Sequence, residues 1–220
     1  MYMPPFEEVK KANEDELLKI IRGTKKKMGR LRNIMEHPDY KYRTDKKCPS
    51  DLVIYKCDRD FLNMAIIRYI SLGGDYKYGQ TELNDTKFND KLEEISKITF
   101  INGGFFEGQR KTVVDLSGND VKLETGFLGS LTPYDIGYDK ENFLYELGEL
   151  HIGEWLKSYQ TERFGISILD GEQWSLEIEY KDGKKKEYGG SNAYPYNYED
   201  LISLLGLNLL EAPFLGEIKT

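Results

Sequence analysis

The sequence predicts an α+β fold, in which a helical basic N-terminal part precedes an antiparallel sheet of about five strands with two or three helices packed on it. Apolar residues as far as Gly74 recur mostly at helical spacing, whereas from Lys97 onward they alternate with polar residues at the period of a strand. Short turns join the strands, which argues against a parallel βαβ arrangement. We expect a helical basic region at 1–74, a linker plus short helix at 75–96, and an antiparallel α+β domain at 97–220, which packs with 1–74 or stands apart.

The first helices are predicted from their start and stop residues. Pro4-Pro5 opens a short helix, and Asn13 followed by Glu16 forms a capping-box pattern before a second helix. We expect Gly23 to end that helix and a third one to run over 24–36.

A strand and a helix are expected next. The continuous apolar run at 52–55 predicts a buried strand, and Asp58 is expected to cap a helix that Gly73-Gly74 closes. Residues 75–85 are rich in Gly, Asn, Asp and Thr and predict a linker, with a short helix around Phe88 after it.

In the second half, the period of two predicts a series of strands, and Asp139 is expected to cap a helix. Residues 117–120 are expected to form a hairpin turn, and 126–137 a loop. Strands are expected at 98–100 and 105–106 around a bulge at 102–104, and at 112–116, 121–127 and 165–169.

The most clearly patterned segment is a hairpin followed by a helix. Apolar residues alternate with polar ones over 174–180, and Asp182-Gly183 suits a tight primed turn with two positive φ angles. The lysines at 184–186 would then face Glu177 and Glu179 across the ladder. After Pro195, which cannot continue a ladder, Asn197 is expected to cap a short helix that Gly206 ends.

This segment also carries a family resemblance. The string LDGEQWSLEIEY…GGSNAYPYNYEDLISLL, preceded by LHIGEWLKSY, resembles a C-terminal module of uncharacterised proteins from low-GC Gram-positive bacteria and their mobile elements. The residues that carry it are Trp174, Asn192, Pro195 and Asn197. The resemblance implies a bacterial or phage setting and no particular activity.

Composition favours a cytoplasmic protein. The N-terminal residues lack the basic and apolar regions of a signal peptide, and no apolar run approaches the ~18 residues of a membrane-spanning helix. Cys48 and Cys57, the two cysteines, flank the expected strand and would lie too far apart for a disulfide, so both are expected as reduced thiols.

Charge is distributed unevenly along the chain. Residues 1–72 hold 16 Lys and Arg against 11 Asp and Glu, whereas residues 73–220 hold 15 against 27. The segment Arg22–Lys47 alone holds 10 basic and 3 acidic residues. Such asymmetry is typical of a protein with an acidic partner, of a basic face that is simply solvated, or of two halves that attract each other.

Two surfaces are candidates for partner binding. The first is a cationic ridge on the expected helix at 24–36 and just before it, and the second is a tyrosine-rich segment, since tyrosine suits recognition surfaces but equally packs beside hairpins. The candidate residues are Arg22, Lys25, Lys26, Arg30, Arg32, Tyr194 and Tyr196. The acidic second half would, in addition, imitate nucleic acid toward a basic partner.

Catalytic and metal-binding motifs are not found. HExxH, GxxxxGK[ST] and GxGxxG are missing, the carboxylates around His151 match no ligand spacing, and no cofactor or metal is expected. The leading hypothesis is therefore a non-catalytic cytoplasmic protein that binds a protein partner, with an immunity-like or host-defence-inhibitor role. One alternative is nucleic-acid binding through Arg22–Lys47. Another is a metal-dependent hydrolase or nuclease that uses the scattered carboxylates Glu107, Asp115, Glu149 and Glu154.

Overall fold

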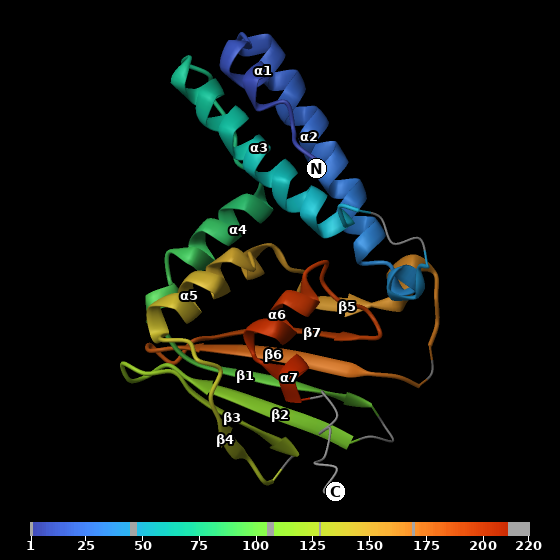
Figure 1. Cartoon of the computed structure of the whole chain (residues 1–220), viewed down its shortest axis with the longest axis vertical. Helices are drawn as coiled ribbons and strands as arrows, with labels where there is room; N and C mark the ends of the chain where they lie inside the picture. The colour runs from blue at the N-terminus through green and yellow to red at the C-terminus, as the bar shows by residue number, and fades with distance from the viewer. Residues whose placement is uncertain (1, 45–47, 105–107, 128, 169, 211–220) are drawn as a thin grey trace, which may run out of the picture. The chain divides into compact units, whose positions relative to one another are not determined.

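The computed structural model describes residues 2–44, 48–104, 108–127, 129–168 and 170–210. The chain divides into two compact units, Met1–Gly79 (the N-terminal unit) and Gln80–Thr220 (the C-terminal unit). The predicted α+β class is confirmed: helices come first, and a mostly antiparallel mixed sheet with helices packed on it follows (Figure 1).

The N-terminal unit is built on two long helices that lie side by side (Figure 1). Its elements are α1 (Phe6–Lys11), α2 (Glu14–Met35), the 3-10 helix η1 (Pro38–Tyr42) and α3 (Asp51–Ser71). The short helix α1 packs on α3, where the rings of Phe6 and Phe61 meet edge to face with their centroids 5.6 Å apart.

The expected capping box at Asn13 and Glu16 is confirmed, because the Asn13 side chain accepts from Glu16 N and the Glu16 side chain accepts from Asn13 N. The expected break at Gly23 is wrong, since α2 continues through it. Ile21 and Thr24 are both buried on the face of α2 that also carries Met28. Packing of this face outweighs the ~1 kcal/mol that a glycine costs inside a helix.

The strand expected at 52–55 is wrong, because these residues lie at the start of α3, directly after its first residue. Ser50 caps the helix by accepting from Val53 N, and Asp58 lies inside the helix instead of at its start. Buried positions at Asp51, Tyr55 and Asp58 keep a helical spacing that the short apolar run does not reveal.

The expected linker is shorter than predicted. Helix α4 (Gln80–Asn89) and the 3-10 helix η2 (Leu92–Glu94) occupy much of 75–96 and belong to the C-terminal unit. Phe88 is fully buried in the core of that unit, which fixes α4 against it in spite of the polar sequence.

The C-terminal unit contains a seven-stranded sheet of order β4-β3-β2-β1-β6-β7-β5, two strands more than predicted. All neighbouring pairs are antiparallel except β5 with β7. The strands are β1 (Ile95–Gly104), β2 (Gly108–Asp115), β3 (Lys122–Phe127), β4 (Thr132–Tyr134), β5 (Ser158–Gln160), β6 (Gln173–Tyr180) and β7 (Lys185–Ser191).

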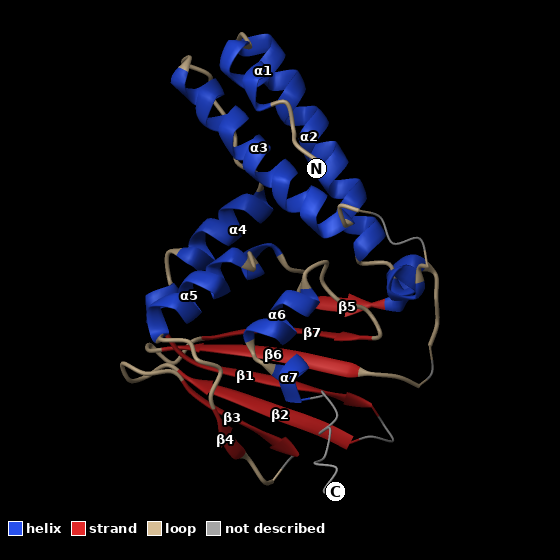
Figure 2. Ribbon diagram, in the orientation of Figure 1, coloured by secondary structure: helices blue, strands red, loops and turns tan. Residues whose placement is uncertain are grey.

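Helices cover one face of this sheet (Figure 2). They are α4, α5 (Lys140–Glu149), α6 (Tyr198–Leu204), α7 (Leu207–Leu210) and the 3-10 helix η3 (Ile152–Glu154), each of which contributes to the core. A further 3-10 helix, η4 (Thr161–Phe164), follows β5. The core lies between the two layers, where Ile98, Phe100, Leu176 and Ile178 of the sheet meet α5 and α6.

Two further expectations for this unit need correction. The loop expected at 126–137 contains β4, and residues 165–168 form no strand, whereas the expected strand at 105–106 lies outside the described residues. Asp139 caps α5 as predicted.

The hairpin of β6 and β7 is confirmed, but its turn is of another kind. Gly183 has a φ of +79°, whereas Asp182 is not among the residues with positive φ, so the turn is not the primed type with two such residues. Lys185 contacts Glu177 at 2.8 Å and Glu179 at 3.6 Å across the ladder, as expected. Lys184 pairs instead with Asp182, and Lys186 Nζ lies 5.1 Å from the centroid of the Phe88 ring.

Tyr134 gives a prediction about alkaline stability. Its hydroxyl donates to Leu205 O at 2.6 Å, and burial raises the pKa of Tyr134 to about 12. The unfolded state therefore ionises first as the pH rises above about 10, and the unfolding free energy falls by up to ~1.4 kcal/mol per pH unit until the folded pKa is reached. Tyr134→Phe should cost about 1 kcal/mol at neutral pH, because the hydrogen bond is lost, and should flatten this alkaline decline.

The measurement is urea unfolding at neutral pH and near pH 11, followed by tryptophan fluorescence, since both tryptophans belong to the C-terminal unit. Tyr138→Phe is the matched control, because Tyr138 is 39% exposed. An alkaline slope of Tyr134→Phe equal to that of the wild type contradicts the prediction.

Candidate interaction surfaces

The cationic ridge is narrower than predicted. Arg22, Lys26 and Arg30 are exposed on α2, and their spacing of four residues places them on successive turns of one face over about 12 Å. Within the described part of the chain, none of the three has an ion pair. These three residues are called the α2 cationic stripe below.

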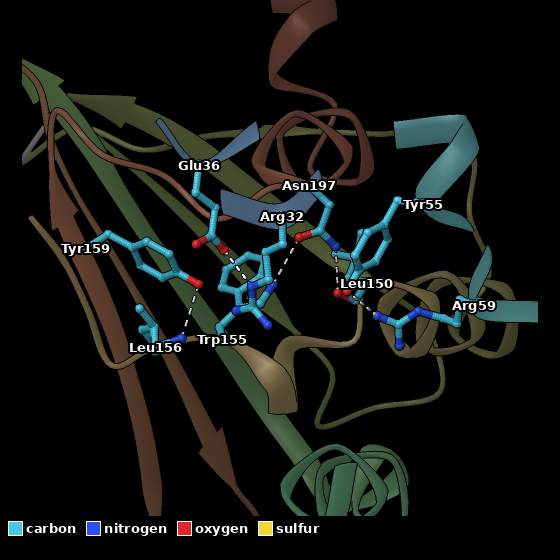
Figure 3. A network of polar contacts seen from close by, with 9 residues as sticks. All are labelled: Arg32, Glu36, Tyr55, Arg59, Leu150, Trp155, Leu156, Tyr159 and Asn197. Atoms are coloured by element: carbon cyan, nitrogen blue, oxygen red, sulfur yellow. Dashed lines mark hydrogen bonds and ion pairs between the residues drawn. The ribbon is translucent and has the colours of Figure 1, made fainter. Parts of the chain in front are cut away.

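The other two predicted ridge residues have partners within the N-terminal unit. Arg32 Nε donates to Glu36 Oε1 at 2.8 Å, and the Glu36 side chain is fully buried (Figure 3). Lys25 Nζ lies 5.0 Å from the centroid of the Tyr76 ring. Arg32 therefore balances a buried carboxylate, and breaking this pair would leave that charge uncompensated.

The described part of the loop that follows α2 does not extend the stripe. Arg43 lies 3.9 Å from Asp51, and Lys41 Nζ stacks over the Tyr42 ring. Lys46 and Lys47 lie outside the described residues. Three of the basic residues of the segment 22–47 are therefore exposed on one helix face, where the sequence indicated a longer basic surface.

Lys27, next to the stripe, has a structural role that sequence patterning did not reveal. Its ammonium contacts Asp58 Oδ2 at 2.7 Å, and it also hydrogen-bonds Tyr2, which donates to Asp58 Oδ1 at 2.5 Å. Burial disfavours the ammonium, but the hydrogen bonds to Asp58 and Tyr2 outweigh it, so the pKa of Lys27 is raised. The triad joins α2 to α3 around a carboxylate that is only 3% exposed.

The tyrosine-rich segment is more enclosed than a contact surface needs. Tyr196 is 9% exposed, and Tyr194 is half-buried, with its hydroxyl donating to Glu172 Oε2 at 2.7 Å. The Tyr194 ring also packs against that of Tyr198, at 4.6 Å between centroids. Packing beside the hairpin accounts for these side chains.

Asn197 precedes α6 as predicted, but its side chain does not cap the helix. Instead, Asn197 Oδ1 accepts from Trp155 Nε1 at 3.0 Å, and Asn197 Nδ2 donates to Leu150 O at 2.6 Å (Figure 3). Close by, Tyr159 Oη accepts from Leu156 N at 3.1 Å. The amide thus links the start of α6 to the segment that follows α5.

Asn192 and Trp174 also have structural roles. Asn192 has a φ of +51°, and its side chain accepts from Glu172 N at 2.9 Å. Trp174 Nε1 donates to Ala193 O at 2.9 Å. Trp174 and Asn192, two of the four residues on which the expected resemblance rests, therefore hold the end of the hairpin in place.

The described carboxylates of the hydrolase alternative do not gather into a metal site. Among the described residues, no three His, Cys, Asp or Glu side chains lie together in a way that would hold a metal, and Glu107 is outside them. Asp115 accepts from Ser117 N, and hydrogen bonds from Ser117 lower the pKa of Asp115. His151, considered with Glu149 and Glu154, hydrogen-bonds Asp85 instead, at 2.7 Å.

Two further expectations concern thiols and membranes. Cys48 and Cys57 are free, as expected, although they flank the first turns of a helix and not a strand. None of the helices that the structure describes has the length and apolar character needed to cross a bilayer.

Lys27→Met should destabilise the N-terminal unit by about 1 to 3 kcal/mol, because Asp58 would be left buried without its cation. The loss should be smaller than for a fully buried pair, since the Lys27 side chain is 44% exposed. Urea unfolding followed by far-ultraviolet circular dichroism, to which α2 and α3 contribute most, measures it. Lys26→Met is the control, and the double variant Lys27→Met/Asp58→Asn should recover part of the loss. Equal stability of the Lys27 and Lys26 variants argues against the triad.

Asn197→Ala should destabilise the C-terminal unit by about 2 to 4 kcal/mol, because a buried indole N–H and a buried carbonyl both lose their partner. Tryptophan fluorescence during urea unfolding reports this unit, since it contains both tryptophans. Asn142→Ala is the control, because Asn142 makes its side-chain hydrogen bond to Asp139 at an exposed helix end. If Asn197→Ala and Asn142→Ala unfold at the same urea concentration, the proposed role of the Asn197 amide is wrong.

No protein-family model, no curated protein and no solved structure matches this chain.

Proposed function

We propose that this protein acts by binding an acidic partner protein through the α2 cationic stripe, without catalysing a reaction. The observation that carries the proposal is the exposure of Arg22, Lys26 and Arg30 on successive turns of one face, without an ion pair among the described residues. Nearby cations such as Lys27 and Arg32 are paired with buried carboxylates. Among the described residues of the segment 22–47, the stripe therefore offers charge that is available to a partner.

An acidic protein suits the stripe better than nucleic acid does. Three cations would neutralise about three phosphates. The logarithm of the binding constant would then fall with the logarithm of the salt concentration with a slope of only about −2.7. Proteins that hold a duplex by charge use more contacts than this, and here the neighbouring cations contact carboxylates or aromatic rings. A protein interface, in contrast, needs a few charges to set its orientation and its rate of association.

An immunity-like or host-defence-inhibitor role is the form of binding that this proposal favours. Such proteins act by covering a surface of their target, so they require a rigid scaffold and complementary charge, and no reactive centre. The long α2 helix, tied to α3 through the Lys27 triad, is a rigid element of this kind. The bacterial or phage setting implied by the C-terminal resemblance agrees with the role.

The double variant Lys26→Glu/Arg30→Glu should lower partner capture about tenfold or more, because two attractive charges become repulsive. The measurement is affinity capture by the immobilised full chain from a lysate of a Gram-positive bacterium, followed by identification of the captured protein. The double variant Lys87→Glu/Lys181→Glu carries the same change of charge on exposed residues of the C-terminal unit and should capture normally.

If the wild type and the α2 variant capture equal amounts of the partner, the stripe does not bind it. Fluorescence anisotropy with a labelled DNA duplex tests the nucleic-acid alternative. Salt-dependent binding that the α2 variant abolishes would support that alternative over a protein partner.

A further inference from the structure

A groove runs along β1, β6 and β7, and residues from both faces of these strands line it. In β1 and β6 the residues that face the helices, such as Phe100 and Leu176, alternate with residues that face away, such as Ile101 and Ser175. The groove has a volume of about 1160 Å³ and lies within the C-terminal unit. Most of its lining comes from the outward residues of β1, β2, β6 and β7, and the rest includes Asn84 of α4, Gly153 of η3 and Trp155.

Small side chains explain why the middle of this face is hollow. The register places Lys111, Ile101, Ser175, Gly189 and Ser158 in one row across β2, β1, β6, β7 and β5. The row crosses four inter-strand spacings, which amount to roughly 19 Å. Ser175 and Gly189 occupy its centre, and a Cβ atom at Gly189 would lie 3.0 Å from Trp174 O.

Positive charge is concentrated along this groove. The lysines that line it are Lys97, Lys111, Lys157, Lys185 and Lys186. Two of them have carboxylate partners on the sheet, since Lys97 lies 3.1 Å from Glu179 and Lys185 lies 2.8 Å from Glu177. Lys111 is one end of the row, and Lys157 directly precedes Ser158 at the other end. Neither lysine has an ion pair within the part of the chain that the structure describes.

The surroundings make these two lysines unusual. Residues 80–220 carry 14 Lys and Arg against 26 Asp and Glu, so most of this unit repels anions. Two separated cations on either side of Ser175 and Gly189 offer a ligand two points of attraction. An extended chain of about six residues spans roughly the same distance as the row.

We propose that this groove binds an extended peptide segment of a partner protein, with acidic side chains near Lys111 and Lys157 and neutral residues over Ser175 and Gly189. The site lies in the other unit from the α2 cationic stripe and does not depend on it.

Single-stranded nucleic acid fits the groove less well. It carries a negative charge at every step, and Glu177 and Glu187 line the groove between its ends. Stacking platforms for bases are also lacking there, since Trp155 and Tyr188, the aromatic residues that line the groove, are 6% and 8% exposed. A peptide with two well-separated carboxylates avoids both difficulties.

The test uses the full chain and fluorescence anisotropy with labelled probes at low and physiological salt. The first probe is a neutral peptide of about twelve residues with two glutamates roughly six positions apart, and the second has the same composition with the glutamates adjacent. The third is an oligo-dT of similar length. We expect the first probe to bind best, and Lys111→Glu/Lys157→Glu to weaken its binding about tenfold.

The α2 variant Lys26→Glu/Arg30→Glu serves as the charge-matched control and should bind the first probe like the wild type. Failure of this control to bind, equal binding of both peptides, or undiminished binding by the Lys111/Lys157 variant would overturn the proposal. Tighter binding of oligo-dT than of the first peptide would assign the groove to nucleic acid instead. The Lys26/Arg30 variant tests the α2 cationic stripe and the Lys111/Lys157 variant tests the groove. Each proposal can therefore fail without the other.

Discussion

The fold of the C-terminal unit depends on finding acceptors for two buried indole N–H groups. Trp155 and Trp174 are 6% and 3% exposed, and their rings pack edge to face with centroids 6.1 Å apart. An unpaired N–H at this depth would cost about 1 to 3 kcal/mol. Asn197 and the carbonyl of Ala193 supply the two acceptors, so the chain after β7 must pass close to both rings. This constraint fixes where α6 begins and brings the segment after α5 against the end of the hairpin.

Local chemistry explains which elements the sequence predicts well. The capping box at Asn13 and the alternation over 174–180 are complete within a few residues, so they are recognisable without knowledge of the fold. The run at 52–55 is equally compatible with a strand and a buried helix turn, and only the packing of α3 on α2 decides between them. The strands β4 and β5 are three residues long and exist because neighbouring strands offer free edges, which no local pattern reveals.

The sequence predicts the exposed charges less well than the helices and strands, because ion pairs form between residues that are distant in the chain. Sequence patterning finds cations on one helix face, but whether each is available depends on partners elsewhere. Arg32 is a case that spacing alone could have identified, because Glu36 follows it at i+4. The partner of Lys27 is Asp58 on another helix, and no spacing rule connects them. The stripe is what remains after structural ion pairs are accounted for.

Net charge is therefore a poor guide to what each unit recognises. At physiological salt the field of a surface charge is screened within about 8 Å, so a ligand in the groove responds mainly to the lysines that line it and much less to the acidic unit as a whole. A nucleic acid, which is charged at every step and extends past the groove, would then be repelled by the acidic surface around it. A peptide that fits inside the groove and carries two carboxylates would meet much less of this repulsion. Two lysines on either side of Ser175 and Gly189 would select a peptide by the spacing of its two carboxylates, and spacing is a property of the ligand that neither composition nor net charge describes.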